Sequence, residues 1–170
     1  MSALLLADAK EHLNVTITLS DAELQQLIDA CEKAIAHWTG PLEPTTKTKR
    51  VAGGSSLFLP PPVISLTSVT PVLPGAVAMD LAGFDIDPET GQVTNYSSLP
   101  LYADRYIVVY QAGYTTLPDD LMLAVKELLR HVYSSSQRKP GSTPSQVVSP
   151  YFLPNFVETL IEPYRGTGFA

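Results

Sequence analysis

The chain has 170 residues, and its 11 lysines and arginines against 17 aspartates and glutamates give a formal net charge of −6. An acidic chain in which charged residues make up only 16% is not a general binder of nucleic-acid phosphates. A single cysteine, Cys31, excludes an internal disulfide framework and a multi-cysteine zinc site.

The low charge also bears on assembly. Apolar residues make up 45% of the chain, and there are 15 prolines. This composition favours an obligate oligomer in which neighbouring subunits cover much of the surface and order the loops, while a monomer with a large core is the alternative. We expect no membrane span, since no apolar stretch is long enough, and no secretory signal at the N-terminus.

Two helices are expected at the start of the chain. The first is predicted over 4–13 from apolar residues at helical spacing. The second is predicted over 21–39, where Ser20 and Glu23 form a capping box and Gly40 supplies the left-handed residue that ends the helix. Its apolar residues follow the helical period: Leu24, Leu27, Ile28, Cys31, Ile35 and Trp38.

A β region is expected over 45–114, where the pattern changes. Short apolar runs at 57–59 and 63–69 end at prolines, and residues 88–91 are typical of a hairpin turn with a left-handed glycine. The strongest strand is 105–110. Because both of its faces are apolar, it is expected at the centre of a small antiparallel sheet.

The rest of the chain is expected to hold one long helix, a linker and a short helix. Pro118 and two acidic residues open a helix predicted over 118–135. Residues 134–150 are rich in Ser, Pro, Gln and Gly, as linkers and extended arms are. Apolar and aromatic residues then return, with a short helix at about 154–162. This last segment either folds back on its own domain or docks on another subunit or a partner.

Together these elements predict an α+β fold. We expect a small helical bundle of three main helices plus a short C-terminal helix, with a small antiparallel β-sheet or hairpin inserted between the second and third helices. The expected division is a core domain at 1–135 and a C-terminal arm at 136–170.

No catalytic constellation is evident, so we do not expect an enzyme and expect no cofactor or bound metal. The three histidines fall in different predicted helices and lack the spacing of metal ligands. Cys31 is expected to be a buried small hydrophobe. Asp85, Asp87 and Glu89 alternate as in a calcium loop, but the glycine and the last ligand position do not fit, and a hairpin turn is the better interpretation.

One basic cluster stands out in this acidic chain. It consists of Lys47, Lys49 and Arg50. On a strand, Lys47 and Lys49 would share one face. The cluster is a candidate for contact with DNA phosphates or for pairing with acidic residues of a neighbouring subunit.

Five short passages, spread over nearly the whole chain, resemble a known protein family in their order and spacing. They are residues 6–13 with 20–31, Trp38-Thr39-Gly40, residues 57–69, residues 110–125 and residues 160–165. They resemble the phage head–tail connector, or adaptor, proteins of long-tailed phages and gene transfer agents. The proline-rich stretch at 71–75 and the long polar arm depart from that pattern.

The resemblance implies a structural virion protein without catalytic activity. Such proteins form a ring, usually of twelve subunits, beneath the portal in the head–tail neck, after assembly in the host cytoplasm. The ring connects the DNA-filled head to the tail or stopper and extends the DNA channel. The implied partners are further copies of the chain, the portal protein, a stopper or tail-completion protein, and passing double-stranded DNA bound without sequence specificity.

Within this family, the C-terminal segment is expected to be an arm that docks on the portal. Its candidate docking residues are Tyr151, Phe152, Phe156, Leu160, Ile161, Tyr164 and Arg165. Two other classes of protein remain open. One is another ring-forming neck or tail-completion protein, such as a stopper, which is expected to be mainly β. The other is a small α+β binding module or enzyme, which needs a convergent polar pocket.

Overall fold

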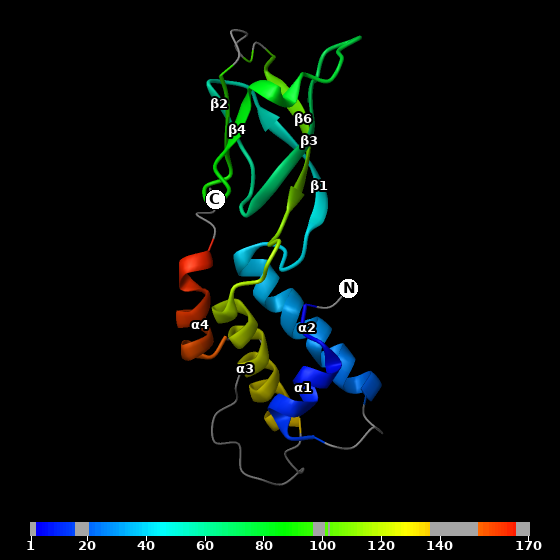
Figure 1. Ribbon diagram of the computed structural model, residues 1–170, viewed down its shortest axis with the longest axis vertical. Coiled ribbons are helices and arrows are strands. Elements are labelled where there is room, and N and C mark those ends of the chain that lie inside the picture. Colours follow the sequence, from blue (N-terminus) through cyan, green and yellow to red (C-terminus); the bar gives the residue numbers. More distant parts are fainter. Residues whose placement is uncertain (1–2, 16–20, 97–100, 102, 137–152, 166–170) are drawn as a thin grey trace. The chain divides into compact units, whose positions relative to one another are not determined.

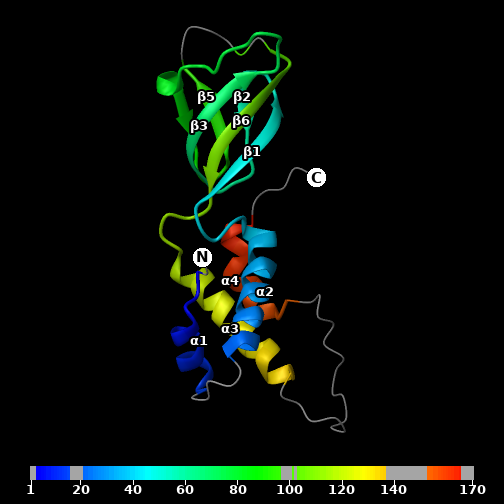
Figure 2. The same ribbon diagram turned by 90° about the vertical axis from the view of Figure 1, so that its right-hand side faces the viewer.

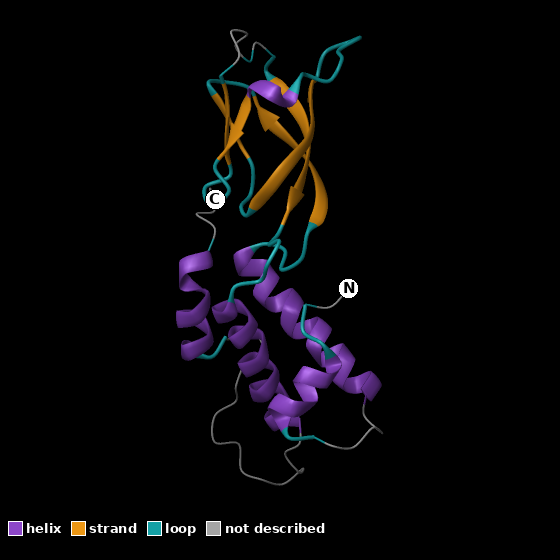
Figure 3. Cartoon of the chain, viewed as in Figure 1, coloured by secondary structure: helices purple, strands orange, loops and turns teal. Residues whose placement is uncertain are grey.

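The computed structural model describes residues 3–15, 21–96, 101, 103–136 and 153–165 (Figure 1). The chain divides into two compact units. The helical unit is built on residues 1–38 and 117–164, and the β unit on residues 39–116. Figure 3 shows the long helices in the first unit and the strands, with one short helical turn, in the second.

The helical unit contains four α-helices in the part of the chain that is described. They are α1 (Leu6–Leu13), α2 (Asp21–Thr39), α3 (Asp119–Ser136) and α4 (Asn155–Ile161), and a 3₁₀ turn, η2 (Glu162–Tyr164), follows α4. Helix α3 packs against both α1 and α4, and Figure 2 shows the four helices gathered together. Each expected helix is present, with ends that differ from the predicted ends by at most two residues.

The helices form because each has one apolar face to bury. The buried apolar side chains of this unit are Leu4, Ala9, Leu24, Ile28, Cys31, Ile35, Leu121, Ala124, Val125, Leu128, Leu129, Val157 and Ile161. Gly40 follows α2 with φ +81°, as its role in ending the helix predicts. Ser20, the expected N-cap of α2, lies outside the described residues. No helix within the described ranges is both long and apolar enough to span a membrane.

The described residues of the β unit form two antiparallel sheets of three strands each. The first sheet has the order β1 (Thr45–Ala52), β6 (Arg105–Ala112), β3 (Val63–Pro71). The second has the order β2 (Ser56–Phe58), β5 (Gln92–Asn95), β4 (Phe84–Ile86), and a 3₁₀ turn, η1 (Leu81–Gly83), precedes β4. Strand β6 lies at the centre of its sheet, which confirms the prediction made from its two apolar faces.

The two sheets share one apolar core. Figure 1 shows β2 and β4 in one layer and β1, β3 and β6 in the other. The buried residues of this core are Val51, Leu57, Leu59, Val63, Val69, Val93, Leu101, Ala103, Tyr106, Val108, Tyr110 and Ala112. All of them belong to residues 39–116, so this unit supplies its own core.

The prediction of a small helical bundle with one inserted sheet or hairpin is wrong. The structure is a mixed α+β fold in which two three-stranded sheets form a unit with a core of its own. Strands β2 and β4 have only three residues each, and the first six residues of β1 are all exposed, so none of these segments carries a strong apolar period. They become strands by pairing with distant segments, β1 with β6 and β2 with β5.

The hairpin between β4 and β5 turns as expected. Gly91 has φ +70°, and a Cβ atom at this position would lie 1.9 Å from the Leu59 carbonyl oxygen, so the turn requires glycine. One carboxylate oxygen of Asp87 accepts hydrogen bonds from the backbone N–H groups of Glu89 (3.0 Å) and Thr90 (3.3 Å). These bonds and one from the Thr90 hydroxyl stabilise the turn.

Candidate interaction surfaces

The described residues do not assemble a catalytic or metal-binding set. Among them, no group of three or more His, Cys, Asp or Glu side chains is placed to hold a metal ion. Cys31 is 3% exposed, and burial, followed by the neighbouring Glu32 charge, raises the pKa of its thiol to about 12. A thiol with so high a pKa is not a nucleophile at neutral pH.

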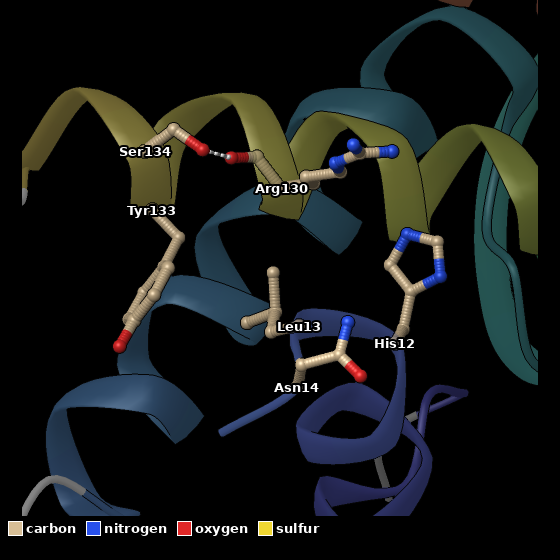
Figure 4. A pocket seen from close by; sticks show the side chains of 6 residues that line it. All are labelled: His12, Leu13, Asn14, Arg130, Tyr133 and Ser134. Carbon is tan, nitrogen blue, oxygen red and sulfur yellow. Dashed lines mark hydrogen bonds between the residues drawn. The ribbon is translucent and has the colours of Figure 1, made fainter.

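An open pocket of about 540 Å³ lies in the helical unit, between the end of α1 and the last turns of α3 (Figure 4). Its lining residues are His12, Leu13, Asn14, Arg130, Tyr133 and Ser134. The imidazole Nε2 of His12 and the guanidinium of Arg130 lie 3.6 Å and 3.8 Å from the same carboxylate oxygen, that of Glu127. The basic groups at this pocket are thus engaged with a carboxylate of their own unit.

Helix α4 is partly core and partly surface. Val157 and Ile161 are fully buried, on the side of the helix that packs against α3. The Tyr164 hydroxyl donates to the carboxylate of Asp120 at 3.5 Å, and burial together with that negative charge raises the pKa of Tyr164. Phe156 is 46% exposed. Ile161 therefore belongs to the core of its own unit, and Phe156 is the accessible aromatic residue of the helix.

The remaining residues of the expected arm are placed as follows. Leu160 and Arg165 are partly exposed, while Tyr151 and Phe152 lie outside the described residues. Docking of this segment stays a prediction, as does the division into a core at 1–135 and an arm at 136–170.

The basic cluster lies on strand β1, at the edge of the first sheet. Lys47, Lys49 and Arg50 are all exposed. Residues directly opposite each other in a sheet share a face. Lys47 pairs with Tyr110 and Lys49 with buried Val108, so both lysines lie on the core side of the first sheet, along its edge strand. Arg50 lies opposite Ile107, on the outer face.

Several exposed apolar side chains were not singled out by the sequence pattern. In the β unit, the loop after β3 exposes Val72 (40%), Leu73 (59%) and Val77 (81%), and β2 exposes Phe58 (52%). The proline-rich composition of that loop and the alternation of Phe58 with buried Leu57 are signals that point to these positions. In the helical unit, Trp38 is 46% exposed although it follows the helical period.

Comparison with known proteins shows which family the chain belongs to. No curated protein matches the chain. One family model, described as "Head completion protein", matches residues 4–167, which include every described helix and strand. This agrees with the resemblance to phage head–tail connector proteins. The chain belongs to the head completion proteins, a family of structural phage proteins that is not known as an enzyme family.

Proposed function

We propose that this protein forms a ring beneath the portal, where it connects the DNA-filled head to the tail or stopper and extends the DNA channel. The observation that carries the proposal is the family match over residues 4–167, since a head completion protein has a structural role in the phage particle and interacts with other head or tail components. The proposed ring has twelve copies, the number that the resemblance implies.

Exposed apolar side chains support an assembled state. A closed ring built from one kind of subunit buries two different patches on each copy. Large apolar residues are more than one-third exposed in both units of the chain. They are Leu5, Trp38, Leu123 and Phe156 in the helical unit, and Phe58, Val72, Leu73, Val77 and Tyr96 in the β unit. Grouped apolar exposure, as in the loop after β3, is typical of interaction sites.

The acidic charge supports the channel role. With a net charge of −6, the chain does not neutralise the phosphates of passing DNA and therefore does not retain it. We assign docking on the portal to the C-terminal segment, with Phe156 as its accessible anchor. Each such contact is modest, but many copies on one ring give high avidity.

Quantitative mass spectrometry of purified particles tests the proposal. The ratio of this chain to the major capsid protein gives the copy number per particle. A neck ring predicts about a dozen copies. Hundreds of copies would instead indicate a shell or tail-tube protein, and absence from the particles would contradict any virion role.

The β unit favours one alternative, a stopper or another tail-completion ring, because a stopper is expected to be mainly β. DNA-filled heads that lack every other neck protein distinguish the two. An adaptor binds the portal directly, so this chain should remain on such heads at an unchanged copy number. A stopper requires an adaptor beneath it and should be lost.

A further inference from the structure

We propose that neighbouring copies bind each other through the two outer faces of the β unit. The basic face, on the first sheet, is defined by Arg50, Arg105, Ile107 and Val109. The acidic face, on the second sheet, is defined by Phe58, Asp85 and Asp87, with Glu89 in the adjoining turn. The basic face of one copy binds the acidic face of the next. This inference rests on the proposed ring and names the contact that closes it.

The strand register defines the basic face. On β6, the buried residues Tyr106, Val108 and Tyr110 face the core, so the residues between them face outward. Arg50 of β1 lies directly opposite Ile107, and Arg105 lies opposite Ala52. Ile107 and Val109 are half-buried, and Arg50 and Arg105 are exposed. The result is an apolar centre beside two positive charges.

These positive charges are not neutralised by the described residues of the unit. Strand β1 carries no acidic residue, and no carboxylate in the described part of the chain forms an ion pair with Arg50 or Arg105. On β3, the residues opposite Ile107 and Val109 are Thr70 and Ser68. The face is therefore polar and basic around its apolar centre.

The acidic face is built in the same way on the second sheet. Buried Leu57 and Val93 face the core, so their neighbours face outward. One row across the sheet joins Ser56, Thr94 and Asp85.

The next row of the acidic face joins an aromatic ring to a carboxylate. Phe58, which is 52% exposed, lies opposite Gln92, and the backbone N–H of Asp87 donates to the Gln92 carbonyl. No Lys or Arg occurs between Phe84 and Asn95. Hydrogen bonds from Thr90 and Glu89 lower the pKa of Asp87, so this carboxylate stays ionised at neutral pH. Phe58 and the exposed Asp87 thus share one row across the sheet, with Gln92 between them.

The two faces complement each other in charge and in apolar character. They belong to opposite layers of one unit, with the shared core between them (Figure 1). A surface on one side of a unit that fits the surface on its other side produces head-to-tail association, and such contacts close into a ring when the rotation between copies allows it. A second copy of this chain is therefore the partner that the observations support.

Cysteine cross-linking in assembled particles tests the contact. Thr48, exposed on the basic face opposite Val109, and Thr94, on the acidic face, are changed to cysteine in one chain. The native Cys31 is buried and does not interfere. Under mild oxidation, the Thr48→Cys/Thr94→Cys chain should give a ladder of disulfide-linked multimers, while each single variant should stay monomeric on a non-reducing gel.

Three results would overturn the contact. In the first, particles contain the double variant but give no ladder. In the second, either single variant gives disulfide-linked dimers. In the third, the double variant forms cross-links only to a different neck protein. The matched control is Lys47→Cys/Thr94→Cys, because residue 47 lies on the same strand but on the core side. It should give no ladder.

Charge reversal provides the second measurement. Arg50→Glu/Arg105→Glu should reduce the incorporation of the chain into particles about tenfold or more. Adding Asp85→Arg/Glu89→Arg in the same chain should restore it, because the charges are then exchanged; Asp87 is left intact because it holds the turn. Lys47→Glu/Lys49→Glu changes the net charge equally but on the core side of the same strand, so it should reduce incorporation less than Arg50→Glu/Arg105→Glu does. The proposal is contradicted if the chain with exchanged charges has the unfolding midpoint of the wild-type chain but is still not incorporated into particles.

The two proposals fail in different ways. If the chain is present at about a dozen copies per particle but the cross-links are absent, the faces are wrong and the neck role stands. If the chain is absent from particles, the neck role fails whatever the purified protein does.

Discussion

Two glycines of the β unit have nearly the same backbone conformation in different surroundings. Gly91 has φ +70° and Gly75 has φ +74°. A Cβ atom at Gly91 would lie 1.9 Å from the Leu59 carbonyl oxygen, whereas one at Gly75 meets nothing within 4 Å. Substituting the two glycines therefore separates two contributions to the loss of stability, that of a left-handed backbone and that of a steric clash.

We expect Gly75→Ala to lower the free energy of unfolding by about 1 kcal/mol, the cost of a left-handed alanine. Gly91→Ala should lower it by more than about 3 kcal/mol, since the backbone of the hairpin must also move away from Leu59. Urea unfolding of the two variants checks this. Equal losses would mean that the hairpin does not pack against Leu59 as closely as described.

Cys31 makes stability depend on pH at the alkaline end. Burial, with the charge of Glu32, raises the pKa of the folded thiol from 9.0 to about 12. The unfolded chain releases this proton near pH 9, while the folded chain keeps it. The contribution of the thiol is therefore complete below pH 9 and is lost as the pH rises from 9 towards 12, with a slope of up to about 1.4 kcal/mol per pH unit.

The measurement is urea unfolding of the wild-type chain and of Cys31→Ala across that pH range. Burial also raises the pKa of Tyr110, so both proteins lose stability in alkali. The difference between them isolates the thiol, and it should shrink as the pH rises. A difference that is independent of pH would show that the thiol is accessible to solvent.

Among the individual elements, α4 has a buried side and an exposed side on seven residues. Ile161 is fully buried and Phe156 is 46% exposed on the same helix. Ile161→Ala should cost about 2–5 kcal/mol of folding stability, because it leaves a cavity in the helical unit. Phe156→Ala should change stability by less than about 0.5 kcal/mol yet reduce incorporation into particles.

The two readouts for α4 are the urea midpoint of the purified chain and its copy number in particles. Deletion of residues 151–170 is a poorer test of docking, since it also removes buried Val157 and Ile161. Normal incorporation of the stable Phe156→Ala chain would contradict the docking role of this residue.

At the scale of the whole molecule, the β unit is an insertion whose two ends meet. Thr45 pairs with Ala112, at the start of β1 and the end of β6, so the chain enters and leaves the unit at adjacent strands. Among the described residues, those of its core all lie within 39–116. An insertion with adjacent ends and its own core has what independent folding requires.

We expect a fragment of residues 39–116 to fold alone, with dispersed amide signals in NMR spectra and a cooperative thermal transition. Val108→Asp should abolish both, because it places an unpaired charge in the core at a fully buried position. A wild-type fragment with the spectrum of an unfolded chain would show that the β unit needs the helical unit to fold.

Features that depend on neighbours along the chain could be predicted from the amino-acid sequence alone. Helical spacing and capping located α2 and α3, Gly40 and Gly91 marked a helix end and a turn, and the two apolar faces of β6 placed it at the centre of a sheet. Each of these signals is contained within a few turns of helix or a few residues of strand, which is why it can be recognised without knowing the fold.

Which distant segments pair and pack together could be seen only in the folded chain. The pairing of β1 with β6, the second sheet, the burial of Ile161 and the exposure of Phe58 all depend on contacts between residues far apart in sequence. Side-chain alternation divides a strand into two faces but does not say which face is covered. The opposite charges of the two outer faces of the β unit depend on which face of each sheet is covered. The two arginines are brought together on one outer face, and the carboxylates on the other, only once the strands have paired and the sheets have packed over their core.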